Sequence, residues 1–251
     1  MYSLAMDVKR QGIRLDGEKL FATCIGTCLG FKEMYGYKGV EITWLGHDGF
    51  LIQDGSESLV IDPFKLTRDE RADFVLLSHE HFDHCNVEDL KKVLKQGSTV
   101  VAIESCRAEL AKVSPKEIKM VKPGDEVRVG GFEVRAIPAY NTNKYREPGK
   151  PFHPKEEGKV GYIIKTKSGV TIYHTGDTDL IPEMNNLAPD IALIPVSGTY
   201  VMTVDEALQA VTRIKPKVAI PMHYGAIVGS SADAEKFKNK AQCEVHILTR
   251  E

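Results

Sequence analysis

The sequence has few of the features that define several common protein classes. Its 251 residues include only five cysteines, an odd number without regular spacing. This argues against a disulfide scaffold and favours a reducing compartment, so we expect a cytoplasmic protein. No run approaches the roughly 18 consecutive apolar residues that suggest a membrane span. The formal net charge is −2, which gives no reason to expect a membrane surface or nucleic acid as a partner.

The first 39 residues lack the regular pattern seen in the rest of the chain. They are irregular and punctuated by glycine, and we interpret 1–39 as an N-terminal extension packed on a domain that spans 40–251. The apolar stretch 20–31 has some character of a signal peptide, but acidic residues precede it and no small-residue cleavage site follows. Cys24 and Cys28 could form a redox pair or a metal clip. A single such pair favours the simpler interpretation as buried small residues.

From residue 40 onward, short apolar strands alternate with amphipathic helices, and 42% hydrophobic with 27% charged residues is typical of a globular protein. We predict strands at 41–45, 50–53, 59–62, 73–78, 99–103, 126–129, 132–137, 160–165, 170–174, 190–194, 217–221 and 244–248. We predict helices at 86–96, 105–113, 179–187, 203–214 and 232–241. Strand-rich segments with helices in both halves indicate an α/β fold of two packed sheets with helices outside, a four-layer αββα sandwich. The long loop 139–159 is then the expected wall of an active site.

Residues 79–84 read His-Glu-His-Phe-Asp-His, which places four potential metal ligands within six positions. Imidazole and carboxylate groups bind Zn²⁺ and similar divalent ions. His79 and His81 project to the same side of an extended chain leaving the strand 73–78. Asn86 is a candidate N-cap for the helix that follows. The segment therefore predicts a rigid metal-binding loop, although a His-rich surface turn is the alternative.

Two further ligand-type residues follow predicted strands. Asp177 lies in His174-Thr175-Gly176-Asp177-Thr178, directly after the strand 170–174, and His223 follows the strand 217–221. Each alone would be interpreted as structural. Three strand ends with such residues in one chain predict a common site, in which His174 orients a carboxylate beside the metal.

These motifs resemble those of the metallo-β-lactamase superfamily over about residues 40–248, with a narrower likeness to the branch that contains the ascorbate-6-phosphate lactonase. The narrower likeness rests on the stretches 43–47, 173–178, 194–200 and 220–225. The resemblance implies that His79 and His81 bind a first metal ion. It implies that Asp83, His84 and His223 bind a second ion, and that Asp177 bridges the two.

One ligand departs from the family pattern. A third His of the first metal usually follows a strand in a Pro-x-x-His turn, but Pro138-Ala139-Tyr140-Asn141 places Asn there. An amide oxygen is a poor ligand for Zn²⁺ and acceptable for harder ions. His153, on the long loop, could replace the missing His as a ligand or contact the substrate. We expect Asn141 to contact the substrate, and His47 either to do so or to have a hydrogen-bonded structural role.

The resemblance implies a metal-dependent hydrolase with two Zn²⁺ ions, with Mn²⁺ or Fe²⁺ as alternatives. A metal-bridged hydroxide would be the nucleophile, and Asp83 would orient it as the catalytic residue. The lysines and arginine of the loop 139–159 favour a small anionic lactone or phosphoester, although a solvated charged loop is an equal interpretation. A phosphodiesterase or nuclease of the same superfamily and a non-catalytic metal-dependent binding protein are the alternatives. A homo-oligomer is possible.

Overall fold

The computed structural model describes residues 13–15, 18–20 and 33–250, and the statements below concern these residues. Cys24 and Cys28 lie outside them, as does most of the segment predicted to be an extension. Strands β1 (Ile13–Leu15) and β2 (Glu18–Leu20) form an antiparallel hairpin within that segment. Strand β3 (Tyr35–Tyr37) also falls there, and it pairs with β4 as the edge strand of a larger sheet.

The first large sheet has seven strands in sequence order, from β3 to β9. After β3 these are β4 (Val40–Gly46), β5 (Gly49–Asp54), β6 (Glu57–Ile61), β7 (Ala72–Leu77), β8 (Leu94–Ile103) and β9 (Glu117–Val121). The pairs from β3 to β6 are antiparallel, whereas β6 to β9 are parallel. The carboxyl ends of β6 and β7 therefore meet at one edge of this sheet.

The second large sheet repeats this arrangement, in the order β10-β11-β14-β15-β16-β17-β18. Its strands are β10 (Glu126–Val129), β11 (Phe132–Pro138), β14 (Val160–Lys165), β15 (Thr171–His174), β16 (Ile191–Pro195), β17 (Val218–Met222) and β18 (Glu244–Val245). From β15 to β18 the strands are parallel. All residues of β16 and β17 are buried, as expected for parallel strands covered on both faces.

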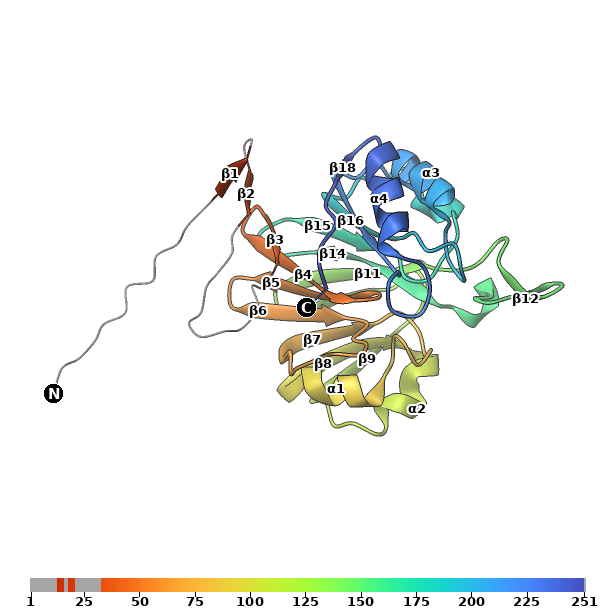
Figure 1. The fold of residues 1–251 in the computed structure, drawn as a ribbon. Helices are drawn as coiled ribbons and strands as arrows, with labels where there is room; N and C mark the ends of the chain where they lie inside the picture. Colours follow the sequence, from red (N-terminus) through yellow and green to blue (C-terminus); the bar gives the residue numbers. More distant parts are fainter. Residues whose placement is uncertain (1–12, 16–17, 21–32, 251) are drawn as a thin grey trace.

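Helices cover the outer faces of both sheets (Figure 1). Helices α1 (Val87–Val93) and α2 (Arg107–Leu110) lie beside β7 to β9, and α3 (Val204–Ile214) and α4 (Ser231–Lys240) lie beside β16 to β18. The two sheets lie between these helical layers. The predicted α/β class and αββα layering are therefore confirmed.

Most predicted elements are present, and the differences have local causes. Asn86 caps α1 by accepting hydrogen bonds from Glu88 N and Asp89 N, as predicted, but the helix ends at Val93 because β8 begins at Leu94. The predicted helix 105–113 is a 3₁₀ turn followed by the four-residue α2. Strand β9 was not predicted.

The predicted helix 179–187 is wrong, because only the 3₁₀ turn Pro182–Met184 forms there. The reason is a competing contact of Asp179. Its side-chain oxygen accepts hydrogen bonds from the backbone N–H groups of Thr142 and Asn143, at 2.6 and 2.9 Å. This ties the segment to the loop 139–159 and holds it away from helical geometry.

The loop 139–159 contains a small hairpin, β12 (Tyr145–Glu147) with β13 (Lys150–Pro151), and a 3₁₀ turn at Lys155–Glu157. Glu206 at the start of α3 anchors it, since Lys144 Nζ lies 2.7 Å from Glu206 Oε2. Glu206 also accepts from Thr203 N at 2.8 Å, completing a capping box. Burial would raise the pKa of Glu206, but Lys144, Asn143 and Thr203 lower it to about 2.

Replacing Glu206 by Gln should lower the free energy of unfolding at neutral pH by about 1 to 3 kcal/mol, because charge-assisted hydrogen bonds are lost. The folded-state pKa is depressed to about 2, so this contribution is complete above the ordinary carboxyl pKa of 4.5 and is lost as the pH falls towards 2. Urea unfolding at pH 7 and pH 3 measures both values. The matched control is Glu133→Gln, an exposed partner of Arg128 and Lys165, which should change little. A Glu206→Gln difference that is equal at both pH values would contradict this assignment.

Candidate metal centre

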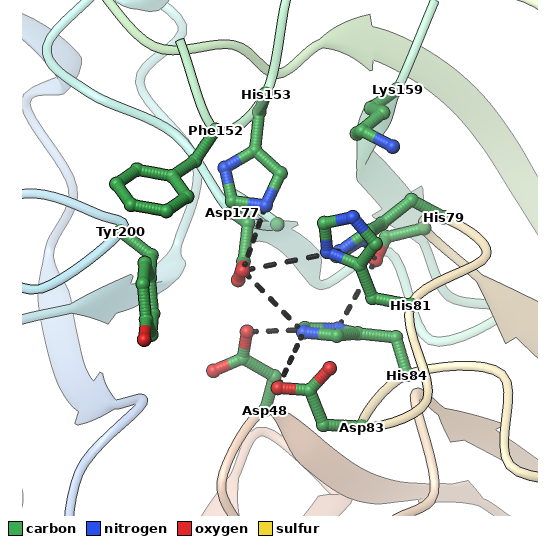
Figure 2. A network of polar contacts seen from close by, with 12 residues as sticks. Asp48, His79, His81, Asp83, His84, Phe152, His153, Lys159, Asp177 and Tyr200 are labelled. Atoms are coloured by element: carbon green, nitrogen blue, oxygen red, sulfur yellow. Dashed lines mark hydrogen bonds and ion pairs between the residues drawn. The ribbon is translucent and has the colours of Figure 1, made fainter. Parts of the chain in front are cut away.

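The predicted ligands meet where strands of both sheets end. His79, His81 and His84 follow β7, Asp177 follows β15 and His223 follows β17. Parallel strands bring their carboxyl ends to a common edge, so residues distant in sequence converge there. Figure 2 shows the histidines of the hexapeptide, Asp177 and His153 pointing into one space.

The Asp177 carboxylate lies at the centre of this group. Its Oδ2 is 3.4 Å from the Nε2 atoms of both His153 and His223, 3.5 Å from His84 Nε2 and 3.9 Å from His79 Nε2. Asp177 is buried. Burial alone would raise its pKa, but His223 and His84 hold the pKa well below its ordinary value. An ionised carboxylate thus lies between imidazoles on two sides.

The first ligand cluster consists of His79, His81 and His153, whose nitrogen atoms lie within 4.8 Å of one another. His79 Nε2 is 3.1 Å from His81 Nδ1. Burial lowers the pKa of His79 well below its usual value and lowers that of His153 to about 4. Neutral imidazoles are the form that binds a metal ion, so this cluster could hold a divalent cation.

Asn141 explains how His153 reaches the cluster. The Asn141 side-chain oxygen accepts hydrogen bonds from both His153 N and His153 Nδ1, each at 2.9 Å. The proton on Nδ1 leaves the Nε2 lone pair facing Asp177 and the cluster. The amide nitrogen of Asn141 donates to Tyr200 O at 2.7 Å. Asn141 therefore contacts the protein at both ends of its amide and fixes the orientation of His153 in the cluster. That Asn141 contacts the substrate, and that His153 replaces the missing ligand, remain predictions.

The second ligand cluster consists of Asp48, His84, Asp177 and His223, and a third group joins His47 to His84 and His223. Asp83, expected here, is turned towards His47, whose Nε2 lies 3.1 Å from Asp83 Oδ2. Asp83 Oδ2 is 3.9 Å from His84 Nε2. Burial would raise the pKa of Asp83, but the hydrogen bond from His47 and the charge of His84 lower it to about 2. His47 thus has a hydrogen-bonded role.

Two carboxylates that lie at the site were not singled out in the sequence, Asp48 and Asp62. Asp62 accepts from Ser78 N at 2.8 Å, from the Ser78 hydroxyl and from His84 Nδ1 at 2.9 Å. Because the Ser78 hydroxyl donates to Asp62, it accepts from His79 Nδ1 at 2.9 Å. Asp62 therefore orients both histidines, with their Nε2 atoms towards the site. Its signal was its position at the end of β6, parallel to β7.

His174 joins the two loops that carry carboxylates. Its Nδ1 accepts from Gly176 N at 3.2 Å, so its proton is on Nε2, which donates to Asp48 O at 2.9 Å. Burial lowers the pKa of His174, consistent with this neutral form. The expectation that His174 orients a carboxylate fits this geometry, because it fixes the backbone beside both Asp48 and Asp177.

The donor atoms fit divalent cations. Among the described residues, buried atoms without a hydrogen-bond partner include His84 Nε2, His153 Nε2, Asp177 Oδ1 and both carboxylate oxygens of Asp48. Leaving such groups unpaired is costly, and cations held by the two ligand clusters would pair with atoms of this kind. In the metal-free chain His84 balances part of the negative charge. Burial lowers its pKa, but Asp177 and Asp62 raise it well above the usual value.

A cavity of about 410 Å³ opens on this centre. It is lined by His81, Phe82, Asp83, Arg146, Phe152, His153, Asp177, Tyr200 and Ile227. The rings of Phe152 and Tyr200 stand beside His153 and Asp177 in Figure 2, with their centroids 4.7 Å apart. Apolar side chains thus form much of the wall.

Most basic residues of the loop 139–159 are paired with carboxylates. Lys144 pairs with Asp179 and Glu206, Lys150 with Glu147, and Lys155 with Glu183. Lys159 is buried and pairs with Glu80 and Glu157. Of the basic residues of this loop, only Arg146 lines the cavity.

A sequence model described as a beta-lactamase superfamily domain matches residues 41–223. A UPF0173 metal-dependent hydrolase from Thermoplasma acidophilum is 34% identical over 215 residues, which cover 80% of this chain and 90% of the relative. A second, from Methanopyrus kandleri, is 31% identical over 216 residues, covering 81% and 92%. The matched residues of the domain include every member of both ligand clusters.

Solved structures of similar fold agree with the sequence relatives. A crystal structure described as a metal-dependent hydrolase from Parabacteroides distasonis has 29% sequence identity and a TM-score of 0.72, covering 87% of this chain and 98% of that one. A zinc-dependent hydrolase of the metallo-beta-lactamase superfamily from Thermotoga maritima, at 21% identity and a TM-score of 0.55, covers 84% and 100%. This second likeness concerns the fold alone. The lactonase branch is not singled out and stays a prediction.

His153 and Asn141 offer a test of the first cluster. His153→Ala should remove one equivalent of bound metal, because the cluster loses one of three imidazoles. The Asn141→Ala variant should retain that equivalent but bind it about 10- to 100-fold more weakly, because the His153 ring loses the hydrogen bond that fixes its orientation. Equilibrium dialysis with elemental analysis measures both. His246→Ala, at a histidine outside the site, is the control; equal metal content in all variants would exclude His153 as a ligand.

Proposed function

The chain belongs to the beta-lactamase superfamily, among its metal-dependent hydrolases, and from this premise we propose that it hydrolyses a small lactone or phosphoester at a centre of two divalent cations. We propose Zn²⁺ at both positions, with Mn²⁺ or Fe²⁺ as alternatives. The observation that carries the proposal is the ionised, buried Asp177 carboxylate between two clusters of ligand atoms. Such a carboxylate can contact a cation on either side.

Bound divalent cations would act as Lewis acids and lower the pKa of water, which supplies a nucleophile at neutral pH. The chain's own residues determine where the reaction occurs. Asp83 has 14% of its side chain exposed and lines the cavity, so it can accept a hydrogen bond from a water molecule there. Its pKa of about 2 keeps it ionised at neutral pH. His47, which is buried, fixes the orientation of that carboxylate.

The cavity supports a substrate with an apolar part and one anionic group. Phe82, Phe152, Tyr200 and Ile227 provide apolar surface, and three of them are substantially exposed, with Phe82 at 66%. Arg146 provides the cationic contact. Its guanidinium donates to Phe152 O at 2.9 Å, which holds it at the rim and leaves other N–H groups for a phosphate or carboxylate. The volume of about 410 Å³ suits a small molecule better than a nucleic acid strand.

The proposed activity predicts metal-dependent turnover. Full-length protein loaded with Zn²⁺ or Mn²⁺ should hydrolyse members of a panel of lactones, phosphodiesters, phosphomonoesters and thioesters. Treatment with EDTA should abolish turnover, and added metal should restore it. Asp83→Asn should lower kcat strongly while the chain stays folded. Bound metal without turnover on the panel would favour the alternative, a metal-dependent binding protein, and turnover confined to nucleic acid would favour the nuclease alternative.

Recognition of an anion by Arg146 predicts a selective effect. Arg146→Ala should raise KM about tenfold or more for phosphorylated or carboxylated substrates and leave uncharged analogues nearly unchanged, because only the former lose a charge-assisted contact. Lys150→Ala, in the same loop but paired with Glu147, is the matched control. Equal effects of the two substitutions on charged substrates would exclude anion recognition by Arg146.

A further inference from the structure

Asp48 is a carboxylate at the metal centre that the family resemblance does not account for. It lies in the turn between β4 and β5, and its side chain points towards Asp177 and His84 (Figure 2). The resemblance gives the second cation the ligands Asp83, His84, His223 and the bridging Asp177. Asp48 has no assigned role in that set.

The Asp48 side chain is fully buried, and neither of its oxygens has a hydrogen-bond partner among the described residues. The nearest nitrogen of His84, Nδ1, is 3.8 Å from Asp48 Oδ2, and Asp62 already occupies that nitrogen at 2.9 Å. A buried carboxylate beside a second carboxylate, with no donor of its own, is strongly unfavourable. Either a proton or a bound cation must therefore neutralise it in the working protein, and the ligand atoms around it favour a cation.

The position of Asp48 relative to the histidines fits a ligand. One donor atom from each of Asp48, His84, Asp177 and His223 lies within 4.8 Å of the others. No such group of ligand atoms includes Asp83 among the described residues. Asp83 is instead held by His47, at 3.1 Å. Asp48 thus lies with the ligand atoms of the second cluster, whereas Asp83 is held by His47 at the rim of the same site.

The turn that carries Asp48 is held in place from several sides. His47 has a φ of 52° and its carbonyl accepts from His223 N at 3.1 Å, while the Asp48 carbonyl accepts from His174. A Cβ atom on Gly49 would lie 3.0 Å from Gly46 O and 3.2 Å from Asp62 O, so the backbone of this turn is packed closely against its neighbours. The carboxylate is thus pre-positioned, as expected for a binding site and not for an adaptable surface turn.

We propose that Asp48 is a carboxylate ligand of the second cation, together with Asp177, His84 and His223. The inference rests on the proposed function, because it requires that a cation binds. It deepens that proposal by giving the second position two carboxylates and two imidazoles, a harder donor set than the three imidazoles of the first. Asp83, which is held by its hydrogen bond with His47, then faces the cavity, where it can contact the substrate.

The test uses metal-free full-length protein and Mn²⁺ as the probe, with the wild type, Asp48→Asn and Asp48→Ala compared. Titration followed by the electron paramagnetic resonance signal of free Mn²⁺ counts the bound equivalents and gives their affinities. The wild type should bind two equivalents. Both variants should keep one and bind the second about tenfold or more weakly. Asp190→Asn, a buried carboxylate paired with Lys217 away from the centre, should bind as the wild type does.

Thermal unfolding distinguishes a ligand from a structural residue. In EDTA, Asp48→Asn should be at least as stable as the wild type, because the amide is neutral without a bound proton or cation and no hydrogen bond of the Asp48 side chain is lost. The rise in Tm on adding Mn²⁺ should be smaller in the variant, since a cation stabilises only as far as it binds the folded state. Asp190→Asn should show the reverse. It should be less stable than the wild type in EDTA, and its Tm should rise as much as that of the wild type when Mn²⁺ is added.

The outcomes separate the two proposals. Two equivalents bound with unchanged affinity in both Asp48 variants would overturn the role of Asp48 and leave the proposed function standing. Lower stability of Asp48→Asn in EDTA with unchanged Mn²⁺ affinity would make Asp48 structural and would also overturn it. A wild type that binds no divalent cation would overturn the proposed function itself.

Discussion

The arrangement depends on one interaction, that of the buried Asp177 carboxylate with the imidazoles around it. Four histidine Nε2 atoms lie 3.4 to 3.9 Å from Asp177 Oδ2. Three of these histidines have their Nδ1 protons engaged elsewhere, by Ser78 for His79, Asp62 for His84 and Asn141 for His153. His223 follows the same rule, because its Nδ1 lies 3.0 Å from a Ser197 hydroxyl that itself donates to a carbonyl. The histidines are therefore oriented with their Nε2 atoms towards a negative charge, and a cation bound between these groups would interact favourably with both.

The fold provides this arrangement through the geometry of its parallel strands. The ends of β6 and β7 in one sheet and of β15 and β17 in the other carry the orienting and binding residues. The backbone is strained at several positions of the site, since His47 in the turn after β4, Asp62 after β6 and His223 after β17 have φ values of 52°, 40° and 59°. Non-glycine residues rarely adopt such φ values, and these conformations persist where the surrounding structure requires them, often at functional sites.

None of the helices in the described residues has the length and apolar character to span a bilayer.

Sequence patterns predicted the parts that local geometry determines. Strand periodicity, the hexapeptide and the Asn86 cap are local signals, and they located both sheets and the hexapeptide histidines that lie in the two candidate ligand clusters. The position of Asn141 indicated a missing His, which directed attention to His153. The contact between Asn141 and His153 could not be predicted, since it depends on the path of a twelve-residue loop segment. Asp48 gave no signal of its own, and the only signal of Asp62 was its position at the end of a strand, where a single Asp is usually a turn residue.

The prediction of a helix at 179–187 was wrong because it too depended on a contact distant in sequence. The helical pattern there is outweighed by the hydrogen bonds of Asp179 with the loop 139–159. The lysines of the loop 139–159 likewise predicted a basic cavity. In the structure they pair with carboxylates instead, with Lys144 between Asp179 and Glu206.

The most direct test of the account is anomalous diffraction from crystals grown with Zn²⁺ or Mn²⁺. Two anomalous peaks, one on each side of the Asp177 carboxylate, are the predicted result. A single peak remote from Asp177, or none at saturating metal, would contradict it.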